Sequence, residues 1–217
     1  MKHYQTMIFD LDGTLLDTLE DLTDAVNASL RMHGYPERTI SEVRTFVGNG
    51  VRRLMMLAHP GGEAAPDFEE VLDDFKTWYA DHSGDKTRPY AGILETLDAL
   101  KKRGVKMAIV SNKFDAAVKQ LNDLYFEDLI PVAIGENEAA GVRKKPAPDS
   151  VYRAMELLGA VPEQTLYIGD SEVDHETSRQ AGLDLVLVSW GFRPRKALEK
   201  YAPLALIDRP EDILKFS

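Results

Sequence analysis

Short apolar runs that end in a small or polar residue recur along the chain and predict buried strands. They occupy residues 6–9, 106–110, 132–134, 165–168, 185–188 and 204–207. Runs of this length that are rich in β-branched residues are typical of strands buried on both faces of a sheet. We therefore expect a sheet whose two faces are both covered by other elements.

Apolar residues at helical spacing lie between most of these runs. The stripes consist of Ile93, Leu94, Leu97 and Leu100, then Ala116, Ala117, Leu121 and Leu124, and then Val151, Met155 and Leu158. Strands that alternate with helices need crossover connections, and such connections favour a mainly parallel sheet. The pattern predicts an α/β fold.

Residues 16–88 break the alternation, because helical spacing continues there without a convincing strand. Three apolar stripes predict three helices, formed around Leu19, Leu22, Val26 and Leu30, around Val51, Leu54, Met55 and Leu57, and around Phe68, Val71, Leu72, Phe75 and Trp78. Asp17 or Thr18 is placed to cap the first helix, and Gly34 to end it. We expect an α-helical cap of residues 16–88, inserted into a core formed by residues 1–15 and 89–217.

Composition narrows the possible functions. The chain has 217 residues, enough for one or two domains, and its net charge of −10 disfavours broad binding to nucleic acid. It has 0 cysteines, which excludes disulfides, thiolate metal sites and a cysteine nucleophile. The apolar segment 7–9 is too short for a signal peptide, and no apolar stretch approaches the roughly 20 residues that cross a bilayer. We expect a cytoplasmic protein that contacts no membrane.

Polar residues gather where the predicted strands end. The residues at or close to these ends are Asp10, Asp12, Ser111, Asn112, Lys145, Asp170 and Asp174. In an open parallel sheet, ligands bind outside the carboxyl ends of the strands. We therefore expect these side chains to converge on one crevice.

Convergence would bring the four carboxylates together, and this carries an electrostatic cost. Two unit charges 4 Å apart repel by about 4 kcal/mol at an effective dielectric constant of 20. A hard divalent cation removes this cost, and Mg²⁺ suits a carboxylate site that also holds phosphate. Ser111, Asn112 and Lys145 add the hydroxyl, amide and positive charge that an anionic substrate needs.

Other well-known ligand motifs do not match. Thr14 and Leu15 stand where a helix–loop–helix calcium site needs Asp or Asn and then Gly. The segment 48–53 lacks the last glycine of the dinucleotide fingerprint, and the chain has no phosphate-binding G-x-x-x-x-G-K-[ST] loop. It has no G-x-S-x-G or H-E-x-x-H motif either, and its five histidines are scattered.

The polar strand ends resemble the four ordered motifs of the haloacid dehalogenase superfamily. The matching residues are Asp10-x-Asp12-Gly13-Thr14, Ser111, Lys145-Pro146 and Gly169-Asp170-x-x-x-Asp174. The resemblance covers the whole chain, because the helical insert matches the position of that superfamily's small cap, and it implies a Rossmann-like core. Residues 47–50 and 188–193 resemble the phosphoglycolate phosphatase branch of the superfamily.

The resemblance implies a reaction. Asp10 would be the nucleophile that forms an aspartyl-phosphate, and Asp12 the general acid and then the general base. A carboxyl group that must hold a proton needs a poorly solvated, charge-crowded position, so we expect such surroundings for Asp12.

The same resemblance implies a set of ligands. Mg²⁺ would be bound by the carboxylates of Asp10 and Asp170 and by the main-chain carbonyl of Asp12. The phosphoryl oxygens would be bound by Ser111, Asn112 and Lys145. Asp174 would support the site through Lys145 or through a metal-bound water.

We therefore predict a Mg²⁺-dependent phosphatase of a small phosphorylated metabolite, with phosphoglycolate favoured by the resemblance. A phosphomutase or a pyrophosphatase that uses Asp10 is an alternative, and so is a non-catalytic module that binds a metabolite or a phosphoprotein. The expected partner is a small anionic phosphate ester, with no nucleic acid, and the chain is expected as a monomer or homodimer. Asn49, Arg52 and Arg53 in the insert are candidates for contact with the substrate.

Overall fold

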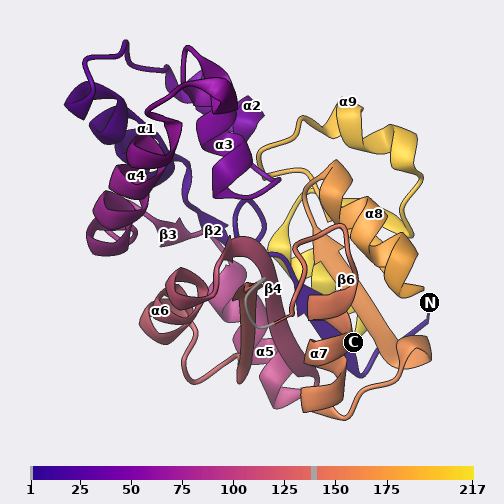
Figure 1. Cartoon of the computed structure of the whole chain (residues 1–217). Helices are drawn as coiled ribbons and strands as arrows, with labels where there is room; N and C mark the ends of the chain where they lie inside the picture. Colours follow the sequence, from indigo (N-terminus) through magenta and orange to yellow (C-terminus); the bar gives the residue numbers. More distant parts are fainter. Residues whose placement is uncertain (1, 138–140) are drawn as a thin grey trace.

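A six-stranded sheet forms the centre of the molecule (Figure 1). The computed structural model describes residues 2–137 and 141–217. The strand order is β5-β4-β1-β6-β7-β8, and every neighbouring pair is parallel. The strands are β1 (Thr6–Phe9), β4 (Lys106–Phe114), β5 (Val132–Glu136), β6 (Thr165–Gly169), β7 (Asp184–Val188) and β8 (Ala205–Ile207). The α/β fold class and all six predicted strands are confirmed.

Helices cover both faces of this sheet. They are α5 (Ile93–Lys102), α6 (Asp115–Tyr125), α7 (Asp149–Leu158), α8 (Glu172–Ala181) and the short α9 (Arg195–Leu198). Alternate residues of β1 point to opposite layers: Met7 and Phe9 pack with α5 and α6, whereas Ile8 packs with α7 and α8. Because both faces of the sheet are buried, the strands appear in the sequence as continuous apolar runs.

Two of the predicted apolar stripes contain surface residues. Leu94 of α5 is 42% exposed and Leu124 of α6 is 60% exposed, so neither belongs to the buried face of its helix. Ala116 is also exposed, and α6 packs instead through Ala117, Val118 and Leu121. Apolar spacing alone does not decide which residues at the edge of a stripe are buried against the sheet.

The helices between β1 and α5 pack around an apolar cluster of their own. We call them the cap helices: α1 (Leu19–Met32), α2 (Ile40–Phe46), α3 (Val51–Ala58) and α4 (Phe68–His82). Figure 1 shows them gathered at one end of the molecule, beyond the end of the sheet. Their shared core includes Val26, Leu54 and Phe75. The three predicted helices are present here.

Two features of this region were not predicted. Helix α2 buries Val43 alone, so it shows no apolar stripe, although Thr39 and Glu42 form a capping box at its start. The expectation that residues 16–88 hold no strand is wrong, because β2 (Leu16–Asp17) pairs with β3 (Arg88–Pro89) in an antiparallel ribbon. Strands of two residues are too short to show an alternating pattern. In the described part of the chain, no helix is both long enough and apolar enough to span a membrane.

Candidate active site

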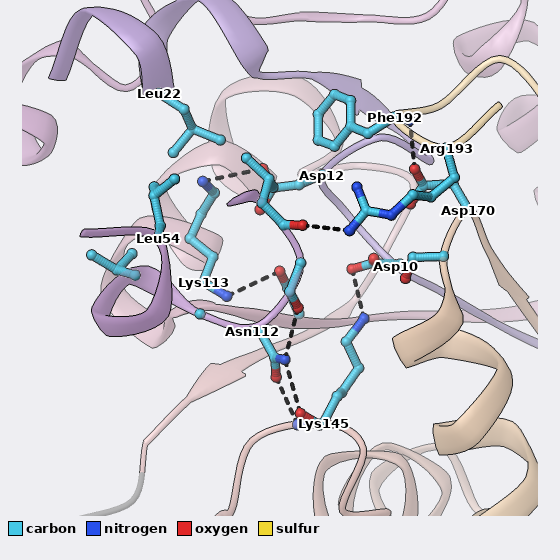
Figure 2. Close-up of a pocket in the computed structure, with 16 residues that line it drawn as sticks. Asp10, Asp12, Leu22, Leu54, Asn112, Lys113, Lys145, Asp170, Phe192 and Arg193 are labelled. Atoms are coloured by element: carbon cyan, nitrogen blue, oxygen red, sulfur yellow. Dashed lines mark hydrogen bonds and ion pairs between the residues drawn. The ribbon is translucent and has the colours of Figure 1, made fainter. Parts of the chain in front are cut away.

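The predicted site residues gather at the carboxyl edge of the central strands. Asp10 follows β1, Ser111 and Asn112 lie in the last part of β4, and Asp170 follows β6. One cavity is lined by six of the seven predicted residues, namely Asp10, Asp12, Ser111, Asn112, Lys145 and Asp170 (Figure 2). Asp174, near the start of α8, lies behind them and is 0% exposed.

Lys145 is a buried ammonium held between two carboxylates. Its Nζ atom lies 2.8 Å from Asp10 Oδ1 and 2.8 Å from Asp174 Oδ1, and it donates to the Tyr167 hydroxyl at 3.2 Å. Burial opposes the charge, but Asp10 and Asp174 outweigh it and hold the pKa of Lys145 well above its usual value. The nucleophile candidate Asp10 therefore has a fixed positive charge beside it.

Asn112 fixes the backbone at Lys145. Its Oδ1 accepts a hydrogen bond from the Lys145 N–H at 2.6 Å, and its Nδ2 donates to the Lys145 carbonyl at 3.0 Å. The same Nδ2 also donates to the Gly48 carbonyl, at 3.1 Å, in the loop between α2 and α3. Because both ends of this side chain have backbone partners, the geometry favours positioning of Lys145 over direct side-chain contact with phosphate.

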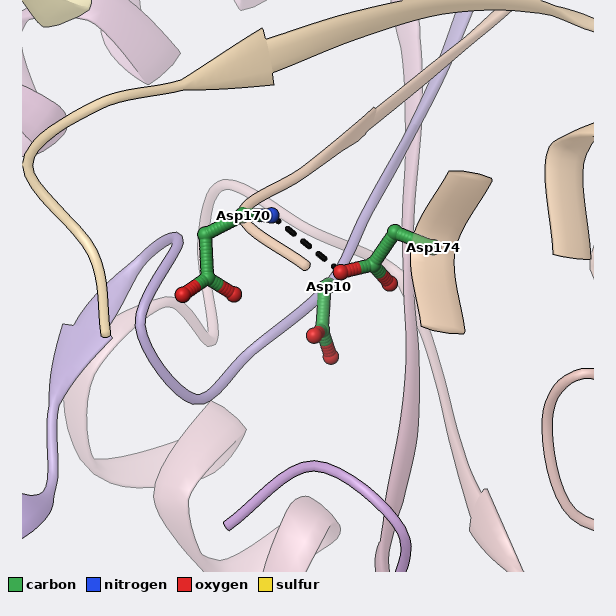
Figure 3. A group of neighbouring side chains, drawn as sticks. All are labelled: Asp10, Asp170 and Asp174. Carbon is green, nitrogen blue, oxygen red and sulfur yellow. Dashed lines mark hydrogen bonds between the residues drawn. The ribbon is translucent and has the colours of Figure 1, made fainter. Parts of the chain in front are cut away.

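Asp10, Asp170 and Asp174 form a carboxylate cluster (Figure 3). Each offers one oxygen, and these oxygens lie within 4.8 Å of one another. Asp174 Oδ1 accepts from Lys145 and Tyr167, while its Oδ2 accepts from the N–H groups of Asp170 and Ser171 and from the Ser171 hydroxyl. Burial opposes ionisation of Asp174, yet Lys145 and these donors outweigh it and lower its pKa. Asp174 is thus a fully bonded anion that supports its neighbours.

The pKa values of Asp10 and Asp170 are raised, in contrast to that of Asp174. Burial, and then the charge of Asp174, raise the pKa of Asp10 well above its usual value and that of Asp170 to about 7. Within residues 2–137 and 141–217, Asp10 Oδ2 and Asp170 Oδ1 accept no hydrogen bond, whereas Asp170 Oδ2 accepts one from the Phe192 N–H at 2.6 Å. Two buried carboxylates with open oxygens fit a hard divalent cation such as Mg²⁺, which would favour their ionised forms.

Glycines allow the backbone to come this close to Asp170. Gly13 has a φ of +82°, and a Cβ atom there would lie 2.5 Å from Asp170 Oδ2. A Cβ on Gly191 would lie 2.4 Å from the same oxygen. Both positions therefore exclude any side chain while Asp170 keeps its place.

Asp12 lies on the cap side of the cavity. Its Oδ1 accepts a hydrogen bond from the Thr18 hydroxyl at 2.7 Å and lies 3.1 Å from Lys113 Nζ. The expected crowding of carboxylates is found at Asp10 and Asp170, whereas the charged neighbour of Asp12 is a cation. Thr18 precedes α1 as predicted, but its side chain accepts no cap hydrogen bond from the helix, and its hydroxyl donates to Asp12.

The cap helices and the loop after β7 complete the cavity wall. The remaining lining residues from these segments include Leu22, Val47, Gly48, Gly50, Val51, Leu54, Phe192 and Arg193. Arg193 donates to the carbonyls of Val47 at 2.8 Å and Arg44 at 3.2 Å, so the loop after β7 is fastened to the cap helices.

The cap residues considered as substrate contacts lie elsewhere. Asn49, Arg52 and Arg53 are not among the residues that line the cavity. Arg52 is paired with Glu63 and Glu69 on the exposed side of α3.

Lys113, Tyr79 and Tyr167 are among the side chains with contacts at the site that were not predicted as site residues. Lys113 directly follows two predicted site residues on β4, and this adjacency is a signal that the sequence contained. Tyr79 and Tyr167 sit among apolar residues of α4 and β6 and read as core, since no pattern marks a hydroxyl that will meet a buried lysine.

Comparison with known proteins shows that the chain is similar to members of one hydrolase family. The family described as haloacid dehalogenase-like hydrolase matches residues 7–188. A phosphoglycolate phosphatase of Aquifex aeolicus is 34% identical, over 97% of this chain and 95% of that protein. A crystal structure from Lactobacillus delbrueckii subsp. bulgaricus is 35% identical with a TM-score of 0.90, covering 98% of this chain and 97% of the other. A predicted phosphoglycolate phosphatase from Haemophilus somnus 129pt has 29% identity and a TM-score of 0.89, covering 99% and 98% of the two chains.

Proposed function

The chain belongs to the haloacid dehalogenase-like hydrolase family, and we propose that it hydrolyses a small phosphate monoester, with 2-phosphoglycolate the favoured substrate. One observation carries the proposal. Asp10 and Asp170 are buried with open oxygens, Lys145 is fixed against Asp10, and Asp12 faces the same cavity. This set provides a nucleophile, a cation site, a phosphate ligand and an acid within one pocket.

The first step forms a bond between a carboxylate oxygen of Asp10 and phosphorus, while the bond from phosphorus to the ester oxygen breaks. Asp12 gives its proton to the departing alkoxide, which leaves as the alcohol. In the second step Asp12 takes a proton from a water molecule, and this water attacks phosphorus to release phosphate and restore Asp10. Asp12 serves both steps because it lines the same cavity as Asp10.

Positive charge at the phosphoryl end comes from the chain and from a cation. Lys145 and the Ser111 hydroxyl bind the phosphoryl oxygens, and Lys145 is held there by Asp174. The carboxylates of Asp10 and Asp170 and the main-chain carbonyl of Asp12 would hold Mg²⁺, which supplies charge that offsets the anionic phosphoryl group when it is bound.

The cap side of the cavity excludes water. Leu22, Leu54 and Phe192 line the part of the cavity around Asp12 and Lys113 with apolar surface (Figure 2). An apolar wall favours transfer to Asp10 over direct attack by solvent, and it strengthens the electrostatic contacts inside. The cap must open to admit the substrate and close for the first step.

A hydrolysis panel tests this proposal. The wild type is expected to release phosphate from 2-phosphoglycolate when Mg²⁺ is present and to lose this activity in EDTA. Asp10→Asn should abolish turnover, whereas Asp98→Asn should not, because Asp98 is exposed and pairs with Lys102 on the surface of α5. Normal turnover by Asp10→Asn would refute the mechanism.

The same panel separates the alternatives. Turnover of inorganic pyrophosphate alone would indicate a pyrophosphatase, and isomerisation of a sugar phosphate primed by a bisphosphate would indicate a phosphomutase. Binding of phosphate esters without any turnover would indicate a non-catalytic module. The phosphatase names of the relatives favour hydrolysis of a phosphate monoester over all three.

A further inference from the structure

The cavity is lined by positive side chains that serve different ends of a substrate. Lys145 faces Asp10 and belongs to the phosphoryl end. Arg193 has little donor capacity left, because four of its five N–H groups are used: Nε and Nη2 donate to Glu172, and Nη1 and Nη2 donate to the carbonyls of Arg44 and Val47. Lys113 is the third cation among the described lining residues, and it stands beside Asp12, where the alcohol half of an ester must lie.

Lys113 is buried, yet it keeps donor capacity. Its side chain is 2% exposed, and its Nζ atom lies 3.1 Å from Asp12 Oδ1 and 2.7 Å from the Tyr79 hydroxyl. An ammonium group has three N–H donors, and these two partners account for two of them. Within residues 2–137 and 141–217 no further acceptor is found for the third, and the residue lines the cavity.

Tyr79 of α4 holds this ammonium in place from the cap. The ammonium lies 4.5 Å from the centre of the Tyr79 ring, in addition to its hydrogen bond with the hydroxyl. Burial raises the pKa of Tyr79 to about 12, so the phenol keeps its proton at neutral pH. Burial opposes the charge on Lys113, but Asp12 and Tyr79 outweigh it and hold its pKa above the usual value. Lys113 is thus a buried positive charge that takes no part in binding the phosphoryl group or the cation.

We propose that Lys113 determines specificity by binding an acid group on the alcohol half of the phosphate ester. The proposal rests on the proposed function, because it assumes that Asp12 reaches the ester oxygen. A carboxylate attached to the carbon next to that oxygen lies only a few bonds away from it. The placement that brings the ester oxygen to Asp12 therefore brings such a carboxylate to Lys113, which is 3.1 Å from Asp12. Esters of neutral alcohols offer the third donor of Lys113 at most an uncharged acceptor, which binds an ammonium group more weakly than a carboxylate does.

A matched pair of substrates tests this role. The esters are 2-phosphoglycolate and 2-hydroxyethyl phosphate, in which a hydroxymethyl group replaces the carboxylate. We expect the wild type to favour the first in kcat/KM, and Lys113→Met to reduce that preference by about 10- to 100-fold, the range expected for one hydrogen bond between charged groups. Any loss caused by a displaced Asp12 affects both esters and cancels in the ratio. Equal losses on both esters would overturn the proposal and leave Lys113 as a positioning residue for Asp12.

One control variant and two further measurements accompany the test of Lys113. Lys102→Met, at an exposed lysine of α5, should leave the preference unchanged. If Lys113→Met does not fold, two measurements remain. Tyr79→Phe keeps the ring but removes the hydroxyl, and it should reduce the preference by a few fold. In the wild type, glycolate should inhibit hydrolysis far more strongly than ethylene glycol.

Failure of the inference differs from failure of the proposed function. A wild type that hydrolyses both esters equally well, or is inhibited equally by glycolate and ethylene glycol, would overturn the role of Lys113 while hydrolysis itself stands. A wild type that hydrolyses no phosphate ester would refute the proposed function, and the inference with it.

Discussion

Replacement of Gly13 by alanine should separate the role of Asp170 from the general stability of the fold. A Cβ atom at position 13 would lie 2.5 Å from Asp170 Oδ2 and 2.8 Å from its Cγ. Ordinary contact begins at 3.4 Å, so the Asp170 carboxylate must move by about 0.9 Å, a displacement that can cost roughly 100-fold in rate. The variant also places an L side chain at a φ of +82°, which destabilises the fold by about 1–2 kcal/mol.

Gly34→Ala is the matched control. Gly34 has a φ of +73°, but a Cβ there would meet nothing within 4 Å. Both variants should therefore lose a similar amount of stability, seen as a fall of several degrees in Tm. Only Gly13→Ala should lose about 100-fold in kcat for phosphate ester hydrolysis and need more Mg²⁺ for half-maximal rate. If Gly13→Ala kept the turnover of Gly34→Ala, the assignment of Asp170 to the reaction centre would be wrong.

Three further predictions concern stability. The pKa of Asp170 is raised from 3.8 to about 7, so without a divalent ion its stabilising contribution is present below pH 3.8 and is lost as the pH rises through about 7. Mg²⁺ should therefore raise the Tm more at about pH 8 than at about pH 5, and Asp170→Asn should remove this difference; an equal effect at both values would contradict it. Tyr167→Phe removes a donor to Asp174 and an acceptor for Lys145. It should lower the free energy of unfolding by about 1 kcal/mol in urea titrations, and an unchanged free energy would contradict this. Ala202 has a φ of +46°, so Ala202→Gly should raise the Tm by a degree or more, and a lower Tm would show that the strain is absent.

The sequence revealed the sheet because its strands are buried on both faces. Residues such as Met7, Ile8 and Phe9 must all be apolar in that setting, and polar residues appear only where the strand stops. The polar residues that follow the strands, such as Asp10 after β1 and Asp170 after β6, lie close together because parallel strands end at one edge of the sheet. A local pattern was enough to predict that edge.

The cap side of the site depends on contacts that no local pattern reports. Tyr79 and Lys113 are 34 residues apart and come from a cap helix and a central strand, and they meet only through tertiary packing. Arg193 lines the cavity and donates to the carbonyls of Arg44 and Val47, which are remote from it in the sequence. Arg52 was considered for a substrate carboxylate because of its charge, but Glu63 and Glu69 pair with it on the surface.

The sign of the charge beside the acid also depends on tertiary contacts. The resemblance implied a poorly solvated, charge-crowded position for Asp12, and the charged group that lies beside it is the cation Lys113. Asp174, expected in a supporting role, accepts five hydrogen bonds and is saturated by them. Which carboxylate keeps an open oxygen depends on the direction of each neighbouring donor, and that direction is fixed by the folded backbone.

The central claim is that the reaction passes through a phosphoryl group on Asp10, and this intermediate can be observed. The wild type would be mixed with 2-phosphoglycolate and Mg²⁺, quenched in acid during turnover and digested for mass spectrometry. We expect one added phosphoryl group on the peptide that contains Asp10, absent before substrate is added and absent from Asp10→Asn. Steady hydrolysis with Asp10 unmodified throughout, or with the phosphoryl group on another residue, would contradict it.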